Sequence, residues 1–336
     1  MVPEELFLKI VRDAVKAPSG HNTQPWLFSR DGNTVIIKPD FSRALPVADP
    51  DHHELYISLG CAAENAVIAA NHYGFRPELR ITGKNKTAFI KIELTENSSD
   101  DSADLYHQIP FRQSTRCAYD EKEIPQADLE ILKKGVAAEG IQIHFLTREQ
   151  DKEKLMPLVC GAIDDQLRNP EFKHELIRWM RFSEKEAIQK GDGLWTACSG
   201  IPATGRVLGT MAMRYLINPR IESKRWRSLI EKSAGFALFT ATENNPDDWI
   251  RTGRTFQRFA LTATSLGIKH SHVNMPCQVL PARRRLAETF GQKGEIPLLL
   301  IRFGYSARMP YAYRRRIHQV LKADSGESPV LTNAIQ

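Results

Sequence analysis

The most informative stretch of this 336-residue chain is Ala17-Pro18-Ser19-Gly20-His21-Asn22-Thr23-Gln24-Pro25-Trp26. A helical pattern stops at Ala17 and an alternating apolar run starts at Trp26, so the stretch is a loop that joins a helix to a strand. Such a connection needs only about two to six residues. This one is longer, and its Ser, Asn and Gln side chains can hydrogen-bond the edge of a flat heterocycle. Alternatively, the same side chains satisfy the loop's own backbone.

The overall composition is that of a globular protein. Apolar residues make up 42% of the chain and charged residues 26%, which allows a sizeable core. The length fits one large domain or two ordinary ones. A net charge of +6 is small for this length. It favours anionic ligands such as phosphates, and without a basic run interleaved with aromatic residues no nucleic-acid surface is expected.

Cysteine usage and hydropathy predict a cytoplasmic protein. The five cysteines are scattered and odd in number, with no C-x-x-C pair, so neither a disulfide framework nor a structural zinc site is expected. Residues 1–15 lack the apolar centre of a signal peptide, and no apolar run approaches the roughly 18 residues of a membrane span. The acidic and histidine cluster at 49–54 could suggest a metal site, but neighbouring side chains at a helix start diverge, and capping residues explain the cluster better.

The sequence of residues 1–98 predicts two helices and two pairs of strands in alternation. Periodicity and turn signals indicate an amphipathic helix, a hairpin closed at Asp31-Gly32-Asn33, a long helix that is apolar or small around most of its surface, and two further strands. The long helix should be buried between layers because so little of its surface is polar. The expected ranges are 3–17, 26–30, 34–38, 52–72, 75–81 and 88–94.

The layout then begins again after an acidic, serine-rich stretch at 96–104, which is the best internal boundary. A helix is expected at 125–138 and a strand at 141–146, followed by charged helical segments at 148–168 and 170–190, an apolar, Met-rich helix at 207–216 and a basic helix at 224–232. Strand 235–240, helix 249–266, an extended piece at 267–273, helix 283–290 and strand 297–303 complete the pattern. The helix–Gly–strand units at 65–81 and 249–273 match each other, with Gly74 and Gly267 in equivalent places, and so predict an α+β fold with internal duplication.

A second polar motif lies in the second half, at Arg112-Gln113-Ser114-Thr115-Arg116. Two guanidinium groups and a hydroxyl at this spacing can neutralise and orient a dianionic phosphate. Alternatively, the motif is a solvated basic turn at a helix end, where ion pairs contribute little. No G-x-G-x-x-G follows a strand and there is no Walker A or G-x-S-x-G motif, so dinucleotide-binding Rossmann, P-loop and α/β-hydrolase classes are not supported.

Together the two motifs resemble those of the nitroreductase-like, FMN-dependent oxidoreductases. Pro-Ser-x-x-Asn-x-Gln-Pro-Trp resembles the family's flavin-contacting loop, and Arg-x-Ser-x-Arg resembles the element that holds the FMN phosphate and ribityl chain. The resemblance covers most of residues 1–320 and is weakest in 148–232. It implies that Met275-Pro276 lies near flavin N5. The residues that it implies contact the cofactor are Pro18, Ser19, Gly20, Asn22, Gln24, Arg112, Gln113, Ser114, Arg116, Met275, Pro276, Arg314 and Arg315.

The ordinary unit of that family is a homodimer, whose flavin site takes the arginines from one subunit and the polar loop from the other. Here the first half carries the loop without the arginine element, and the second half carries the arginines without the loop. The chain therefore resembles the fused, single-chain Acg-like subgroup. The resemblance implies one non-covalent FMN per chain, halves at 1–98 and 105–322, a lid-like insertion at about 170–232 and a loose tail at 323–336.

The same resemblance implies the chemistry. NAD(P)H would be the electron donor and a small nitroaromatic or quinone the acceptor, and the flavin would need no catalytic side chain. An alternative is a protein that stores or sequesters FMN with little turnover, since the middle segment could close over the site with Trp195, Met211, Met213 and Tyr215. We expect a monomer or weak homodimer with small-molecule partners only.

Overall fold

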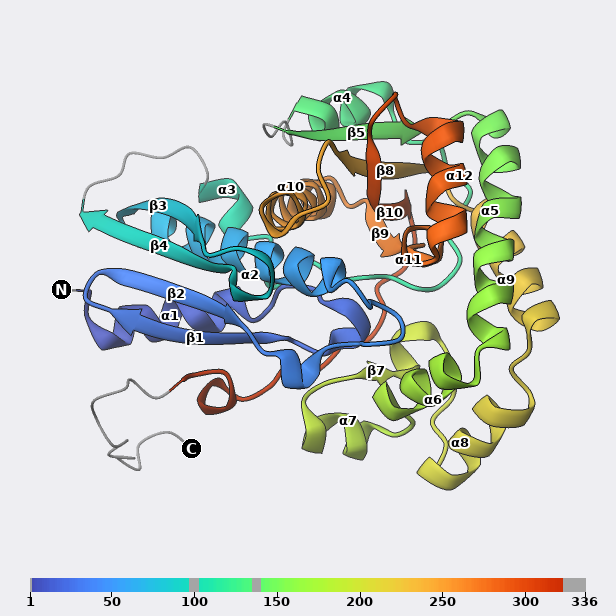
Figure 1. The fold of residues 1–336 in the computed structure, drawn as a ribbon, viewed down its shortest axis with the longest axis horizontal. Coiled ribbons are helices and arrows are strands. Elements are labelled where there is room, and N and C mark those ends of the chain that lie inside the picture. The colour runs from blue at the N-terminus through green and yellow to red at the C-terminus, as the bar shows by residue number, and fades with distance from the viewer. Residues whose placement is uncertain (1, 97–102, 135–139, 323–336) are drawn as a thin grey trace.

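The computed structural model describes residues 2–96, 103–134 and 140–322 (Figure 1). Helices and two separate antiparallel sheets alternate along the chain, which confirms the α+β class. Part of the predicted boundary at 96–104 and the predicted tail at 323–336 lie outside the described residues. Among the helices described, none is both long enough and apolar enough to cross a membrane.

The first half forms a four-stranded sheet against a pair of helices. Its strands follow the spatial order β1-β2-β4-β3, with every neighbouring pair antiparallel. Two of its short 3₁₀ turns, η1 and η2, flank the first hairpin along the chain. The elements are α1 (Glu4–Ala14), η1 (Gly20–Asn22), β1 (Trp26–Asp31), β2 (Thr34–Pro39), η2 (Phe41–Arg43), α2 (His53–His72), β3 (Phe75–Thr82), η3 (Asn85–Thr87) and β4 (Phe89–Glu96).

The second half repeats this order around its own sheet. Its strands are arranged β5-β8-β10-β9, again antiparallel throughout. The elements are α3 (Ala103–Tyr106), α4 (Gln126–Lys134), β5 (Ile141–Leu146), β8 (Gly235–Ala241), α10 (Pro246–Ser265), β9 (Lys269–His272), α11 (Met275–Gln278), α12 (Leu280–Phe290), β10 (Ile296–Gly304) and η5 (Ile317–Gln319).

A helical insertion replaces the first hairpin turn in the second half. Where β1 and β2 are joined directly, β5 and β8 are separated by residues 147–234, which form the right and lower part of the molecule in Figure 1. The elements are α5 (Glu149–Arg168), α6 (Pro170–Trp179), β6 (Met180–Arg181), α7 (Glu184–Lys190), β7 (Leu194–Trp195), η4 (Thr196–Ser199), α8 (Arg206–Tyr215) and α9 (Pro219–Glu231). The single helix predicted for 170–190 is therefore wrong. It ends at Trp179, and Ser183 caps a new helix by accepting from the Glu186 N–H at 3.3 Å.

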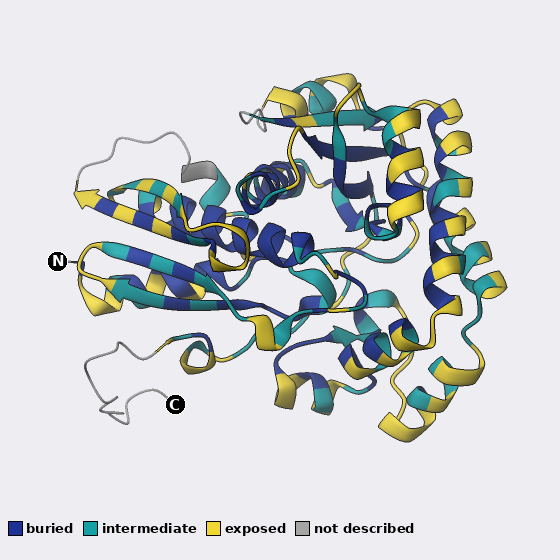
Figure 2. Cartoon of the chain, in the orientation of Figure 1, coloured by how far each residue is buried: buried dark blue, intermediate teal, exposed yellow. Residues whose placement is uncertain are grey.

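The two long helices α2 and α10 lie side by side at the centre of the molecule (Figures 1 and 2). Each has 20 residues, and one constant shift in residue number carries α2 onto α10, and Gly74 onto Gly267. Both glycines adopt positive φ just after the helix, a backbone conformation that other residues resist. As predicted, α2 is buried almost all round.

The contact between α2 and α10 is reciprocal. A Cβ at Gly60 would lie 2.1 Å from the Ile250 carbonyl oxygen, and a Cβ at Gly253 would lie 2.0 Å from the Ile57 carbonyl oxygen. The shift in residue number that relates the helices carries Ile57 onto Ile250 and Gly60 onto Gly253, so the two contacts are equivalent. It also carries Tyr56 onto Trp249, and these two rings pack with centroids 5.8 Å apart. This self-complementary pattern is that of an isologous, two-fold interface. Glycine is required on both sides because the backbones touch.

Candidate functional site

The strongest candidate site is a cavity of ≈ 320 Å³ between the two halves and the insertion. This volume lies in the range of small-ligand sites. The first half supplies the polar loop and the start of α2, and the second half supplies Arg116, β9, α10 and α11. The insertion supplies an apolar wall. The lining side chains used below are Pro18, Ser19, Gly20, His21, Glu54, Arg116, Gln166, Met213, Ile217, His272, Asn274, Met275 and Gln278.

The loop predicted to contact a ligand has a strained backbone. His21, Asn22 and Gln24 all have positive φ (46°, 55° and 54°), which non-glycine residues rarely adopt. Asn22 holds this conformation by donating from Nδ2 to the carbonyl oxygens of Gly193 and Tyr313, both at 3.1 Å. Strain of this kind persists only where the surroundings fix it, and it concentrates at functional sites.

Gln24 is fully engaged within the protein. Its Nε2 donates to the Gly191 and Asn22 carbonyl oxygens at 2.8 and 3.3 Å, and its Oε1 accepts from the Arg315 N–H at 2.8 Å. Arg315 in turn donates from Nη1 to the Gln24 carbonyl oxygen at 3.0 Å. These side chains tie the loop to the insertion and to the C-terminal segment, which is the backbone-satisfying alternative considered from the sequence.

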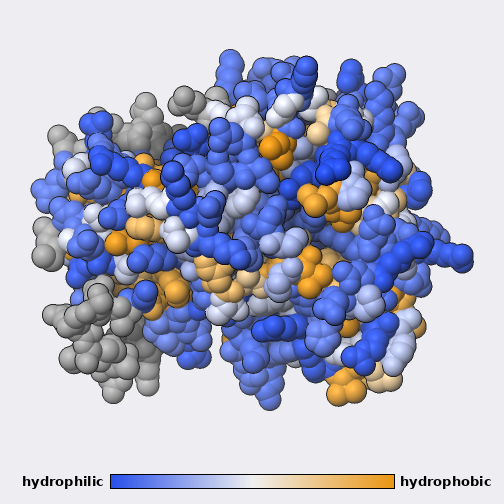
Figure 3. All heavy atoms as spheres, in the orientation of Figure 1, coloured by the Kyte–Doolittle hydropathy of each residue, from blue (hydrophilic) through white to orange (hydrophobic). Residues whose placement is uncertain are grey.

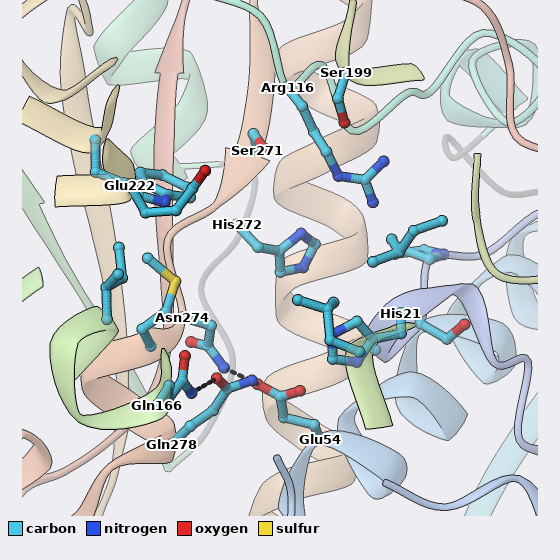
Figure 4. Close-up of a pocket in the computed structure, with 18 of the residues that line it drawn as sticks. His21, Glu54, Arg116, Gln166, Ser199, Glu222, Ser271, His272, Asn274 and Gln278 are labelled. Atoms are coloured by element: carbon cyan, nitrogen blue, oxygen red, sulfur yellow. Dashed lines mark hydrogen bonds between the residues drawn. The ribbon is translucent and has the colours of Figure 1, made fainter. Parts of the chain in front are cut away.

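Arg116 has a different environment. It lines the cavity, and among the described residues its guanidinium has neither a hydrogen-bond nor an ion-pair partner. Burial lowers its pKa, and the charge of the neighbouring Arg225 adds to that effect. Figure 4 shows its side chain extending into the pocket between Ser199 and His272. A cation that faces a cavity without a counter-charge is suited to bind an anion.

Two further arginines, Arg314 and Arg112, lie near Arg116 but do not line the cavity. Arg314 donates to the carbonyl oxygens of Val15, Lys16 and Ala17 at 3.0–3.3 Å, and Arg112 donates to that of Lys16 at 3.2 Å. These carbonyls follow the C-terminal end of α1, where cations are favoured by the helix dipole. Arg112 nevertheless keeps Nε and Nη1 buried with no hydrogen-bond partner in the described part of the chain.

The three guanidinium groups disfavour one another's charge. Burial, together with the charges of its neighbours, lowers the pKa of Arg112 to about 10 and that of Arg314 to about 9. A guanidinium does not lose its proton at neutral pH. The consequence is a buried positive cluster whose repulsion a dianion such as a phosphate would relieve.

Two histidines next to this cluster are neutral. Burial and the charge of Arg116 lower the pKa of His21 to about 4 and that of His272 to about 3. His270, on the same strand as His272, is buried, and among the described residues both of its ring nitrogens lack a hydrogen-bond partner.

The acidic and histidine cluster at 49–53 is explained by capping and ion pairing. The Asp49 carboxylate accepts from the Glu54 and Leu55 N–H groups at 3.1 and 2.9 Å and so caps α2. His53 Nδ1 lies 2.6 Å from Asp51 Oδ1 and 3.0 Å from Asp49 Oδ1, close enough for the three side chains to share a metal ion. Arg283 already supplies positive charge there, since its Nη1 lies 3.3 Å from Asp51 Oδ2.

The predicted contact residues fall into groups. Pro18, Ser19, Gly20, Arg116 and Met275 line the cavity, and Arg112 and Arg314 lie behind it. Gln113 instead holds the Met309–Pro310 segment through its side-chain amide. Asn22, Gln24 and Arg315 hydrogen-bond within the protein and hold the loop in place. Ser114 and Pro276 do not line the cavity. The cofactor roles of all the predicted residues remain predictions. Sequence reasoning missed His21, Glu54, Gln166, Asn274 and Gln278, for which no motif exists.

Comparisons with known proteins bear on the whole chain. No family profile matches it. A Mycobacterium tuberculosis protein, provisionally named an NAD(P)H nitroreductase, is 24% identical over 325 residues, which is 92% of this chain and 89% of that protein. The chain is therefore similar to a nitroreductase over nearly its whole length. The predicted family resemblance is thereby confirmed, whereas membership of the fused subgroup remains a prediction.

Solved structures with some likeness to this chain include nitroreductases. One is a nitroreductase-like family protein from Bacillus cereus, with 15% identity, a TM-score of 0.40, and coverage of 69% of this chain and 99% of that one. Another is an FMN-dependent nitroreductase from Mycobacterium smegmatis in complex with NADPH, with 13% identity, a TM-score of 0.41, and coverage of 67% and 100%. TM-scores of this size carry no argument about this protein's fold or ligands.

Proposed function

We propose that this protein is an FMN-dependent NAD(P)H oxidoreductase that reduces a small acceptor such as a nitroaromatic or a quinone. One observation carries the proposal: Arg116, a cation with no partner in the described ranges, shares a cavity with a strained polar loop from the other half of the chain. The family resemblance supplies the identity of the ligand, and the positive cluster behind Arg116 fits that ligand's phosphate.

The residues present fit FMN. Arg116 would hold the phosphate, with Arg112 and Arg314 close by. Arg112 Nε and Nη1, which are buried and have no partner among the described residues, can donate hydrogen bonds to an anion. Ser19 and Gly20 would lie against the ring, where the absence of a side chain at Gly20 leaves room. When bound, FMN would supply the hydride chemistry, while the protein binds, orients and shields it.

The proposed site is single and shared between the halves. The loop comes from residues before α2, while Arg116 and Met275 come from the second half, so neither half alone supplies the whole lining. Together with the matched sheet orders and the reciprocal α2–α10 contact, this supports the fused pseudo-dimer with one FMN per chain. Further association, as a monomer or weak homodimer, is part of the same proposal.

The second candidate function is FMN storage or sequestration. The insertion favours it, because Met213 on α8 and Ile217 after it contribute to the cavity wall and restrict entry of a second substrate. Trp195 packs on Tyr313, with ring centroids 5.5 Å apart, at the insertion's contact with the C-terminal segment. A storage protein and an oxidoreductase would share every contact to FMN, so only turnover separates them.

The experiment is steady-state oxidation of NADH and of NADPH by the purified, FMN-loaded protein, with menadione or a nitroaromatic as acceptor. Acceptor-dependent oxidation well above the rate of free FMN supports the oxidoreductase. Tight FMN binding with a rate no higher than that of free FMN supports storage. A protein that binds no FMN would contradict both.

A further inference from the structure

Glu54 is a buried carboxyl group that the proposed function does not yet use. It lies in the first turn of α2, is 8% exposed, and lines the cavity. Its Oε2 comes within 3.2 Å of the position that a Cβ would take at Gly20, so this oxygen faces the polar loop. Figure 4 shows Glu54 at the foot of the pocket, below His21 and beside Asn274.

The other carboxyl oxygen, Oε1, receives two amide donors from α11 and the residue before it. Asn274 donates from Nδ2, and Gln278 donates from Nε2 at 2.8 Å. The orientation of both amides is fixed by their oxygens. The Oδ1 of Asn274 accepts from the Leu300 N–H at 2.9 Å, and the Oε1 of Gln278 accepts from Gln166 Nε2 at 2.6 Å. Both donors therefore converge on Oε1, and Oε2 has no hydrogen bond among the described residues.

The charged groups around Glu54 do not include a partner cation. Burial raises its pKa, and the nearby Asp49 carboxylate raises it further, while His53 and the two amides act in the opposite direction. His53 is engaged elsewhere: although burial opposes its charge, Asp49 and Asp51 raise its pKa to about 9. Arg283 contacts His53 and Asp51 and makes no ion pair with Glu54 among the described residues.

Another buried acid on the same helix shows the contrast. Glu64 is fully buried, and its two oxygens are paired with Arg254 at 2.7 Å and Arg258 at 2.5 Å. A buried carboxylate is usually paired in this way because removing its charge from water is costly. Glu54 instead has its carbonyl-type oxygen satisfied by amides and its second oxygen open to the cavity, which is the geometry of a neutral carboxylic acid.

We propose that Glu54 carries a proton on Oε2 and donates it to the oxygen of an acceptor molecule bound in the cavity. The inference rests on the proposed oxidoreductase function and adds a proton-donating side chain to it. The acceptor class is one that presents a carbonyl or nitro oxygen, since such an oxygen can accept the Oε2–H hydrogen bond and then its proton.

The step balances for a quinone. Conversion to a hydroquinone adds one hydride and one proton; bound FMN, with NAD(P)H as electron donor, would supply the hydride, and Oε2 would supply the proton. The Glu54 carboxylate left behind is stabilised by the Asn274 and Gln278 donors. Solvent returns the proton before the next turnover.

The first test is infrared spectroscopy of the protein without cofactor, at neutral pH. Wild-type protein should show the carbonyl band of a protonated carboxylic acid, persisting well above the pKa of 4.5 that an unperturbed glutamate has. Glu54→Gln should abolish the band. Glu175→Gln is the matched control, because this buried carboxylate accepts from the Val47 and Ala48 N–H groups outside the cavity, and the band should remain. A spectrum that Glu54→Gln leaves unchanged would overturn the proposal.

The second test compares two acceptors. Ferricyanide takes an electron and no proton, so Glu54→Gln should slow the reduction of menadione far more than the reduction of ferricyanide. Reduction of menadione should fall by roughly a hundredfold, a typical loss for a general acid. The wild-type protein alone gives a further check: its menadione rate should fall as pH rises and its ferricyanide rate should not, and identical pH profiles would contradict the proposal.

These outcomes separate the two proposals. If the protein neither binds FMN nor oxidises NAD(P)H, the proposed function fails, and the infrared band still decides the protonation of Glu54. If both acceptors are reduced and Glu54→Gln has full menadione activity, the oxidoreductase stands and the role of Glu54 does not.

Discussion

At the residue scale, the site is defined by which polar groups lack a partner inside the protein. Gln24 and Asn22 carry the family-like motif, yet their amides hold the loop against Gly191, Gly193 and Tyr313. Arg116 carries the second motif, lines the cavity, and has no side-chain partner among the residues that the structure describes. The binding energy is therefore expected at the phosphate end, with the loop acting mainly through its shape.

Replacing Arg116 by alanine tests this distribution. The variant loses a charge-assisted contact of roughly 1.5–3 kcal/mol, so FMN should bind about ten- to a hundredfold more weakly. Fluorescence titration of the apoprotein with FMN measures this directly. The exposed Arg284 on α12 provides the control, and Arg284→Ala should bind as wild type. Equal affinity of Arg116→Ala and wild type would contradict the assignment of the phosphate.

The neutral His21 predicts sensitivity to acid. Its pKa is about 4 in the folded protein against 6.5 when unperturbed, because burial and Arg116 disfavour the proton. A depressed pKa contributes stability that is present above about pH 6.5 and is lost as the pH falls towards 4. Between about pH 7 and pH 5 this residue alone should cost the wild type on the order of 2 kcal/mol.

Urea unfolding of apoprotein at these two pH values measures the effect. His21→Asn keeps a residue that tolerates positive φ and removes the titration, so its stability should depend less on pH than that of the wild type. The same pH dependence in both proteins would show that His21 is not buried in its neutral form.

Where a motif marked the residue, sequence reasoning selected side chains that line the cavity, namely Pro18, Ser19, Gly20 and Arg116. Their contact with FMN stays a prediction. Glu54 could not be predicted, because its environment is made by Asn274 and Gln278, more than 200 positions away along the chain. Only the fold brings these groups together, and no local spacing encodes that meeting.

At the element scale, α2 and α10 determine how the halves meet. Gly253→Ala would place a methyl group 2.0 Å from the Ile57 carbonyl oxygen, so the helices must separate. Despite a helix-propensity gain of roughly 1 kcal/mol, the protein should lose about 2–3 kcal/mol, as expected for overpacking between backbones. Thermal and urea unfolding would give the value.

A matched substitution separates packing from propensity. Gly161 lies within α5, and a Cβ there would meet no atom within 4 Å. Gly161→Ala should therefore gain up to about 1 kcal/mol. If both variants were stabilised, the close α2–α10 contact would be contradicted.

The elements themselves were largely predictable. Strand 141–146 was predicted with its observed bounds, and α2 within one residue, because periodicity, caps and glycine stops agree there. The break at Met180 was missed, since the charged pattern continues across it and the short β6–β7 pairing depends on a segment beyond the next helix, α7.

At the scale of the whole molecule, the two sheets have the same strand order, β1-β2-β4-β3 and β5-β8-β10-β9, and the long helices exchange equivalent contacts. The duplication was predicted from weak matches around Gly74 and Gly267. The sequence did not reveal the matched sheet orders, because strand pairing is non-local.

Separation of the halves should destroy the fold. Residues 1–98 and 105–322, expressed alone, would each expose a large apolar face of α2 or α10, so neither should be soluble with a cooperative unfolding transition. Co-expression should rescue both. Two independently folding, soluble fragments would show instead that the halves are ordinary domains.

The most direct test of the account is the number and identity of the flavins bound. Purified protein saturated with flavin, then denatured, should release FMN at about one per chain, since the loop of one half and Arg116 of the other form a single shared site. Chromatography and absorbance of the released cofactor give both answers. Two flavins per chain would contradict the single shared site, and FAD would contradict the role of Arg116 at a terminal phosphate.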